Sequence, residues 1–306
     1  MREMKVDTEE RSVTTMELTN EYIVDWIRTR MAQKEFNNMG MLPGYGTFPG
    51  YAFDEPDVGF SRGDDPLYAF YKEHIDADFY RRPEEWLSAK YRHEVDPSEV
   101  SVISWVLPQT QDTRDKSRKE KSCPPLEWTM VRVFGELYNL RMAKALEQHL
   151  NELGYEAVAP MGAEGFTIAN HEKFVQVSNW SERHAAYISG LGTFGLCDGL
   201  ISAKGKAVRY GSLIVRAKLT PTERPYTSYR EYCLADKGCR ACIERCPAGA
   251  ITEAGHDKKK CMEYKKTHIT PINRDRYNYD GFGVCGLCQT GVPCESCIPG
   301  RKKTDG

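Results

Sequence analysis

The chain has 306 residues, which is enough for one large domain and a small one. Its 42 Lys and Arg residues nearly balance 44 Asp and Glu residues, and the formal net charge of −2 excludes a global basic field that would recruit nucleic acid. Residues 1–11 are charged, and no run of eighteen apolar residues occurs, so we expect neither a signal peptide nor a membrane span. These features predict a protein of the reducing cytoplasm, where free thiols persist.

The first third of the chain predicts one helix and one long irregular segment. Thr19 or Asn20 can cap a helix, because their side chains accept hydrogen bonds from free backbone N–H groups. Residues at helical spacing then predict a face packed on the core, namely Tyr22, Ile23, Trp26 and Ile27. From Gly40 to Pro66, glycine, proline and aromatic residues are dense. This composition predicts an irregular segment that forms either a lid over a site or a wrap on the core.

The middle of the chain predicts alternating strands and helices. Val100 to Leu107 is an almost continuous apolar run, which predicts a strand buried on both faces of a mostly parallel sheet. The charged run from Asp112 to Ser122 predicts a solvated loop. Leucines and other apolar residues at helical spacing predict a long helix from Pro125 to Gly154, and a second strand follows at Tyr155 to Ala159. Strand, helix and strand in this order form a βαβ unit.

A glycine-rich segment comes next. Asn179 or Ser181 can cap a short helix that leads into Gly190-Leu191-Gly192-Thr193-Phe194-Gly195. This hexapeptide has the G-x-G-x-x-G pattern of dinucleotide-binding turns, but that pattern must follow a strand and open a helix, whereas this one follows a helix. The glycines permit either a close approach of the backbone to a flat ligand or plain tight turns. Another strand is predicted at Tyr210 to Val215.

Nine of the eleven cysteines fall between Cys233 and Cys297, and this density indicates a metal site. The first run is Cys233-x5-Cys239-x2-Cys242-x3-Cys246-Pro247, and its end matches the bacterial ferredoxin pattern, in which the cysteine before proline binds the other cluster of a pair. The second run is Cys285-x2-Cys288-x5-Cys294-x2-Cys297, with Cys261 between the runs. Eight thiolates suit two 4Fe–4S clusters and leave one cysteine over.

Two other roles for these cysteines compete with clusters. Four-cysteine zinc sites use paired C-x2-C motifs and rarely contain C-x2-C-x3-C-Pro, while disulfide frameworks belong to small secreted domains. The spacing therefore favours clusters. On these patterns we divide the chain into residues 1–99, which belong to the main domain, residues 100–225, an α/β cofactor-binding core, and residues 226–306, the domain with the clusters.

Several of these motifs occur together in one superfamily. They are Ser181-Glu182-Arg183, Gly190-Leu191-Gly192, Gly195, Gly211-Ser212 and the two cysteine runs. In this order and spacing they resemble the epoxyqueuosine reductases and reductive dehalogenases, which are cobalamin-dependent iron–sulfur reductases. The resemblance covers residues 100–299. It implies an α/β (α+β) cobalamin-binding domain of nitroreductase-related type, followed by a small ferredoxin-like domain with two 4Fe–4S clusters.

The resemblance also implies which residues hold the cofactors. It places around a base-off cobalamin the residues Arg183, Gly190, Leu191, Gly192, Gly195, Gly211 and Ser212. It assigns one cluster to Cys233, Cys239, Cys242 and Cys294. It assigns the other cluster to Cys246, Cys261, Cys285 and Cys288. The sequence has no D-x-H-x-x-G, the mark of cobalamin bound through a protein histidine, and a flavin is the alternative cofactor.

Three positions depart from the family pattern. Asp236 stands where the first cysteine of the usual run is expected, so Cys233 is left to supply that ligand. The last ligand is displaced, and both Cys294 and Cys297 remain candidates for it. Gln176 stands where epoxyqueuosine reductases have an acidic proton donor, and an amide cannot donate a proton as a carboxylic acid does.

The identity of the catalytic residues therefore stays open. The candidate proton donors are His184, Tyr187, Tyr210 and Gln176. Histidine and tyrosine at such positions more often pack with their polar atoms satisfied. Cys197 can be a reactive thiol, but an isolated cysteine in an apolar context is usually a small core residue.

We expect an oxidoreductase, similar to epoxyqueuosine reductase, that cleaves or deoxygenates a small organic substrate with electrons from an external donor such as a ferredoxin or flavodoxin. The chain ends at Gly306 and leaves no room for the C-terminal helical-repeat domain of many epoxyqueuosine reductases. Together with a pI near 6.4, this argues against a nucleic-acid partner. The alternative is an electron-transfer or corrinoid-handling protein, such as a cobalamin reductase or carrier, without a substrate of its own.

Overall fold

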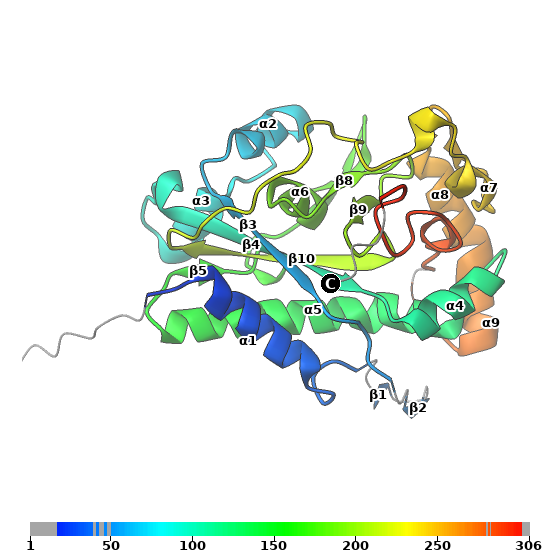
Figure 1. The fold of residues 1–306 in the computed structure, drawn as a ribbon, viewed down its shortest axis with the longest axis horizontal. Coiled ribbons are helices and arrows are strands. Elements are labelled where there is room, and N and C mark those ends of the chain that lie inside the picture. Colours follow the sequence, from blue (N-terminus) through cyan, green and yellow to red (C-terminus); the bar gives the residue numbers. More distant parts are fainter. Residues whose placement is uncertain are drawn as a thin grey trace, which may run out of the picture.

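The computed structural model of the chain describes residues 17–38, 41–42, 46–47, 50–279, 281 and 283–301. A four-stranded sheet runs through its centre, with helices on both faces (Figure 1). The strands lie in the order β3 (Asp57–Arg62), β4 (Val100–Pro108), β10 (Val208–Arg216) and β5 (Ala157–Val158). Within the described residues, no helix has the length and apolar character needed to cross a membrane.

The predicted buried strand is confirmed, because every residue of β4 is buried. The prediction of a mostly parallel sheet is wrong, since β10 pairs antiparallel with β4 on one side and with β5 on the other, and β3 is antiparallel to β4. The long helix α5 (Leu126–Glu152) connects β4 to β5, as predicted, but β10 lies between these two strands. A continuous apolar run records burial on both faces and carries no information about the direction of the neighbouring strand.

The two faces of the sheet pack against different helices. On one face, α1 (Asn20–Ala32) and α5 cover Ile103, Trp105 and Leu213 (Figure 1). On the other face, α2 (Pro66–Ile75), α3 (Pro83–Tyr91) and α6 (Glu182–Ile188) cover Val102 and Ile214. Neighbouring residues of a strand point to opposite faces, and both faces are covered, so β4 is apolar throughout.

Two predicted helix starts are confirmed. The hydroxyl of Thr19 accepts a hydrogen bond from the backbone N–H of Tyr22 at the start of α1, and Ile23 and Ile27 on the predicted face are fully buried. The hydroxyl of Ser181 accepts one from the backbone N–H of His184 at the start of α6. Side-chain caps of this kind satisfy N–H groups that have no partner within the helix.

Two segments predicted as irregular contain regular structure. The run predicted as a solvated loop forms helix α4 (Gln111–Lys119), whose Thr113, Arg114 and Ser117 face inward and are buried. Its buried face is polar, so it lacks the apolar repeat that predicts a helix. The segment 40–66 contains the edge strand β3 and a short pair, β1 (Met41–Leu42) and β2 (Gly46–Thr47). Residues 40, 43–45 and 48–49 of that segment lie outside the described residues.

The cysteine-rich part of the chain forms short elements at one end of the sheet, beside α4 (Figure 1). Two hairpins precede β10: β6 (Ile168–His171) with β7 (Val175–Ser178), and β8 (Gly192–Phe194) with β9 (Leu200–Ser202). The cysteine-rich part contains α7 (Ala241–Glu244), β11 (Ile251–Thr252), β12 (Gly255–His256), α8 (Lys258–Tyr264), a π-helical turn (Lys265–Ile269), α9 (Thr270–Tyr277) and a 3-10 turn (Leu287–Gln289). The division of the chain at residues 99 and 225 stays a prediction.

Gly211 shows why a glycine occurs in the middle of β10. The indole Nε1 of Trp105 donates a hydrogen bond of 2.7 Å to Asn139 Oδ1 on α5. A Cβ on Gly211 would lie 2.4 Å from that Nε1 and 2.5 Å from that Oδ1. The glycine therefore makes room for a hydrogen bond between the sheet and α5.

We predict that Gly211→Ala lowers the free energy of unfolding by about 1–3 kcal/mol, because buried neighbours must shift. Gly50→Ala is the matched control, since a Cβ there meets no atom of the described residues within 4 Å, and it should change stability by less than about 0.5 kcal/mol. Denaturant unfolding followed by tryptophan fluorescence measures both variants. Equal stability of the two variants would contradict the packing role of Gly211.

Candidate functional site

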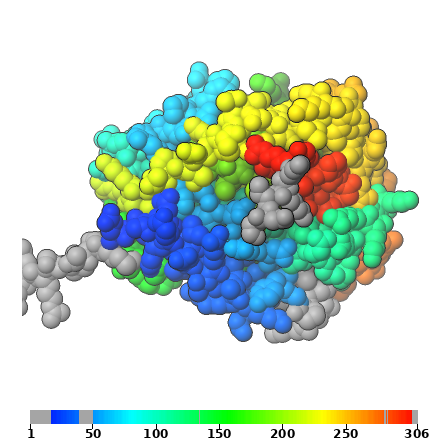
Figure 2. Space-filling model, in the orientation of Figure 1, coloured from blue at the N-terminus to red at the C-terminus, as the bar shows by residue number. Residues whose placement is uncertain are grey.

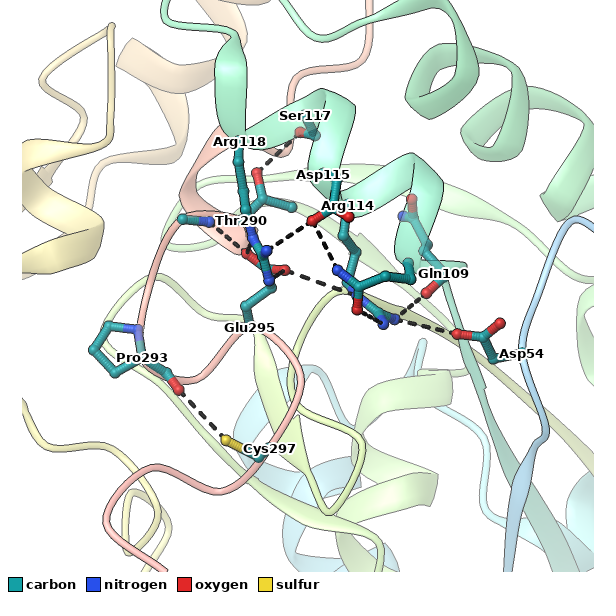
Figure 3. Close-up of polar contacts among 12 residues, drawn as sticks. Asp54, Gln109, Arg114, Asp115, Ser117, Arg118, Thr290, Pro293, Glu295 and Cys297 are labelled. Carbon is teal, nitrogen blue, oxygen red and sulfur yellow. Dashed lines mark hydrogen bonds and ion pairs between the residues drawn. The ribbon is translucent and has the colours of Figure 1, made fainter. Parts of the chain in front are cut away.

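Four cysteines from three segments line one small cavity, and we call them the first cysteine set: Cys233, Cys239, Cys242 and Cys294. They are the four that the resemblance assigns to one cluster. The other walls are mostly apolar and include Leu196, Ile201 and Val292. Cys297, the rival for the last position, does not line this cavity and donates a 3.7 Å hydrogen bond to the backbone oxygen of Pro293 (Figure 3).

A second cavity is lined by the other four predicted ligands, and we call them the second cysteine set: Cys246, Cys261, Cys285 and Cys288. Cys246 follows α7 and precedes Pro247, whereas Cys261 lies on α8. Pro247, Ile251 and Tyr264 complete much of the wall. The ninth cysteine of the region is therefore Cys297, which lines neither of the two cavities.

The chemistry of both donor sets fits iron–sulfur clusters. Each set presents four sulfurs in a largely apolar surrounding, and cubane clusters are held by four thiolates. Among the described residues, no three His, Cys, Asp or Glu side chains converge closely enough to share one metal ion.

A buried thiol and a buried amine lie between the two sets. Cys197 is hydrogen-bonded to Cys242 of the first set and to Cys288 of the second set, and these bonds hold the pKa of its thiol well below the usual range. The ammonium group of Lys206 lies 3.2 Å from the sulfur of Cys197. Burial disfavours the charge of Lys206, but the sulfur of Cys197 and then that of Cys294 raise its pKa. The sequence carried no signal for Lys206 beyond its place near the glycine segment.

Helix α4 holds the loop that carries Cys294. The buried carboxylate of Glu295 accepts hydrogen bonds from Arg118 Nε (2.9 Å) and Arg118 Nη2 (2.6 Å) (Figure 3). Earlier in the same loop, the hydroxyl of Thr290 lies 2.9 Å from the hydroxyl of Ser117 on α4. Figure 2 shows this last loop, in red, on the surface beside α4, in green. The charged run that was predicted to be solvated therefore positions a predicted cluster ligand.

A much larger cavity, of about 620 Å³, lies next to the second cysteine set. Its walls come from α2, the β6–β7 hairpin, α6, β8 and the start of α8. Many of the lining side chains are aromatic or basic, among them Tyr71, Phe194, Tyr229, Arg183, Lys258 and Lys259. A concave site of this size, with apolar surfaces and a few charged groups, suits an organic ligand.

His256 lies between this large cavity and the second cysteine set, because it lines both. Its Nδ1 is 3.2 Å from Asp198 Oδ2. The hydrogen bond with Asp198, and then the one with Cys261, raise the pKa of His256 to about 9. Sequence reasoning missed this residue, whose only signal was its position between two cysteine ligands. One side chain therefore separates the predicted second cluster from the large cavity.

Among the residues predicted to surround cobalamin, Arg183 lines the large cavity and donates a hydrogen bond to the backbone oxygen of Asp198. Gly190 and Leu191 line another cavity, of about 350 Å³, next to α1 and the C-terminal loop. Gly195 lines the cavity of the first cysteine set.

The other three predicted cofactor residues pack within the chain. A Cβ on Gly192 would lie 2.2 Å from the backbone oxygen of Ile201, which belongs to β9, the partner strand of β8 in the hairpin. Gly211 adjoins Trp105, and the buried hydroxyl of Ser212 accepts a 2.9 Å hydrogen bond from Trp180 Nε1. The contacts within the chain account for both glycines without a ligand.

The four candidate proton donors separate into two pairs. His184 and Gln176 line the large cavity, while Tyr187 packs against Tyr226 and Tyr210 donates a 2.6 Å hydrogen bond to the backbone oxygen of Leu200. Burial, and then the positive charge of Arg183, lower the pKa of His184 to about 3, so its ring is neutral near pH 7. A neutral imidazole cannot serve as an imidazolium acid.

Glu182 belongs to the Ser181-Glu182-Arg183 motif but is not among the predicted proton donors. It lines a small cavity under α6 together with Ser212 and Asn139. Burial raises the pKa of Glu182 to about 8, against the opposing effect of its hydrogen bond with Ser212. Its Oε2 is buried and has no hydrogen-bond partner among the described residues. Glu182 is therefore protonated near neutral pH.

No family model matches the sequence, and a search of curated proteins finds no match. Solved structures do match. Epoxyqueuosine reductase from Streptococcus thermophilus is 13% identical with a TM-score of 0.45, over 93% of this chain and 69% of that chain. An epoxyqueuosine reductase crystallised with a tRNA-Tyr stem loop is 15% identical with a TM-score of 0.48, over 90% of this chain and 64% of that chain.

The catabolic reductive dehalogenase NpRdhA also matches, at 14% identity and a TM-score of 0.48, over 92% of this chain and 37% of that chain. The chain thus spans about two thirds of the length of these epoxyqueuosine reductases and little more than a third of the dehalogenase.

We predict that Glu295→Ala lowers the free energy of unfolding by about 1–3 kcal/mol, because Arg118 and the buried loop lose their central acceptor. Asp115→Ala is the matched control: Asp115 lies 2.7 Å from the same Arg118, but both side chains are exposed, so we expect a change below about 0.5 kcal/mol. Denaturant unfolding measures the difference. If both variants lose the same stability, α4 does not hold the cysteine loop through Glu295.

Proposed function

We propose that this chain is an oxidoreductase that uses two 4Fe–4S clusters and cobalamin to reduce a small organic substrate. The observation that carries the proposal is the arrangement of two four-cysteine cavities side by side, with His256 between the second of them and a cavity of about 620 Å³. Clusters pass one electron at a time, so this order provides a path from the first cysteine set to the second and on to the large cavity.

In this proposal each cysteine set holds one cubane, within a C-terminal part of ferredoxin-like type. Electrons come from an external donor such as a ferredoxin or flavodoxin. Helix α4 and Glu295 keep Cys294 in place, and His256 lies between the inner cluster and the reaction site. The low pI of the chain argues against a nucleic-acid substrate.

The large cavity is the proposed site of cobalamin, in an α/β part of nitroreductase-related type. Bound cobalamin would supply a redox-active cobalt for reductive bond cleavage or deoxygenation. Aromatic side chains such as Phe194 and Tyr229 offer flat apolar surfaces, and Arg183, Lys258 and Lys259 favour negatively charged groups of a ligand. His184 Nδ1 is buried, has no partner among the described residues and is available for a hydrogen bond with a bound group, as donor or acceptor according to the tautomer.

A second candidate function is electron transfer or corrinoid handling without an organic substrate. The observation that favours it is Gln176, which lines the large cavity at the position where an acidic proton donor was expected. Of the other proton-donor candidates, His184 is neutral, and Tyr187 and Tyr210 do not line the cavity. A flavin remains the alternative cofactor for the same space.

We predict that protein purified without oxygen contains about eight iron and eight acid-labile sulfide per chain, as two cubanes require. Cys294→Ser should lower the iron to about four, because this residue lines the first cavity. Cys297→Ser, the matched control, should leave the iron unchanged. Iron, sulfide and zinc assays on the wild type and both variants measure the cluster content. Stoichiometric zinc, or a loss of iron only in the Cys297 variant, would contradict the ligand assignment.

We predict that cluster-replete protein binds cobalamin base-off, with a cob(II)alamin spectrum that lacks axial nitrogen. Arg183→Ala should weaken this binding on the order of tenfold through loss of one charged contact in the cavity. Lys34→Ala, an exposed residue of the loop after α1, is the control and should leave binding unchanged.

Equilibrium titration followed by absorbance and paramagnetic resonance measures the binding. No affinity for cobalamin would refute the cofactor assignment and direct the same titration to flavins. Cobalamin binding without turnover of organic halides or epoxides by the reduced protein would favour the corrinoid-handling function.

A further inference from the structure

Lys206 is a lysine that is buried against the first cysteine set. Only 3% of its surface is exposed, and it lines the cavity that this set surrounds. Its backbone N–H donates to the backbone oxygens of Cys294 (2.9 Å) and Glu295 (3.1 Å). The preceding residue, Gly205, has φ +78°, and a Cβ there would lie 2.2 Å from the oxygen of Glu295. The backbone of Gly205 and Lys206 therefore packs directly against the backbone of Cys294 and Glu295.

The side chain of Lys206 is surrounded by sulfur. Its Nζ donates a 3.2 Å hydrogen bond to Cys197, and its side chain is also hydrogen-bonded to Cys294. A buried ammonium group is costly unless an anion compensates it. The polar neighbours of this one are sulfurs, and Cys294 among them belongs to the first cysteine set, whose thiolates would carry negative charge as cluster ligands.

We propose that the buried cation of Lys206 raises the reduction potential of the cluster held by the first cysteine set, relative to the cluster held by the second. The proposal rests on the proposed function, since it requires both clusters. Reduction adds one electron to a group that is already negative, and a nearby cation in a medium of low dielectric constant stabilises the reduced form. Lys206 lines the first cavity only, so the first cluster is affected more.

The consequence concerns the direction of electron flow. The second cysteine set adjoins the large cavity through His256, and the first set does not line that cavity. A cluster held by the first cysteine set would accept one electron from a donor protein, which is itself oxidised. With the potential raised by Lys206, that cluster would hold the electron in preference to the second cluster and would serve as an electron store.

The test compares Lys206→Met and Lys206→Gln with two further variants. Lys206→Arg keeps the positive charge. Lys204→Met removes a lysine two residues away, whose side chain is 40% exposed and lies 3.9 Å from Asp57. Redox titration of the cluster-replete proteins, followed by paramagnetic resonance, gives the midpoint potential of each cluster. The signal of the first cluster is the one that Cys294→Ser removes.

In Lys206→Met and Lys206→Gln, we expect the reduction equilibrium of the first cluster to shift at least tenfold toward the oxidised form, which is about 59 mV for a one-electron couple. The second cluster should shift less. Lys206→Arg should shift the first cluster less than either neutral variant, and Lys204→Met should leave both potentials unchanged.

Unchanged potentials in the neutral variants, or an equal shift in Lys204→Met, would overturn the proposal. Loss of the first cluster from both neutral variants would also overturn it, because Lys206 would then hold the cluster in place and not tune it. Wild-type protein without iron refutes the proposed clusters themselves. Wild-type protein with both clusters but no turnover refutes the enzyme function and leaves the role of Lys206 to be decided by the potentials.

Discussion

The ion pair between Arg118 and the buried Glu295 joins the cysteine-rich part of the chain to the central sheet. Arg118 lies on α4, which follows the buried strand β4 after only two residues, so its position is set by the core. Glu295 follows Cys294 directly. The ion pair therefore fixes the position of Cys294, a predicted cluster ligand, relative to the sheet. A buried carboxylate requires such a partner, since its charge would otherwise be uncompensated.

Electrostatic balance around the sulfurs is the second constraint. Eight cysteines line two adjacent cavities and would place much negative charge in a small volume as the thiolates of the proposed clusters, and the chain sets a different basic group beside each cavity. Lys206 adjoins the first set, whereas His256 adjoins the second and is paired with Asp198. The lysine borders the first cavity only, while the histidine also borders the large cavity. The two proposed clusters thus have different surroundings, as a directed electron path requires.

A glycine can allow close approach either of another part of the chain or of a ligand, and the sequence does not show which of the two applies. Gly192 and Gly211 allow backbone to pass close to Ile201 and to the hydrogen bond between Trp105 and Asn139. Arg183, from the same group of motifs, does line the large cavity. A motif of glycines therefore marks places of close approach, but what approaches is as often the chain itself as a ligand. The charged and aromatic side chains of the cavity say more about its occupant.

The sequence by itself determined the buried strand β4, the long helix α5 and the caps at Thr19 and Ser181, whereas the division of the cysteines into two ligand sets came from the family resemblance and stays a prediction. The strand, the helix and the caps depend on local spacing and on the chemistry of single residues, which a linear pattern records. Tertiary structure alone decided that β10 inserts between β4 and β5, that α4 is a helix with a polar buried face, and that Lys206 and His256 flank the cysteine sets. These features join residues far apart in the chain through charges and hydrogen bonds. Such pairings leave no periodic trace in the sequence, because each partner alone looks like an ordinary solvated residue.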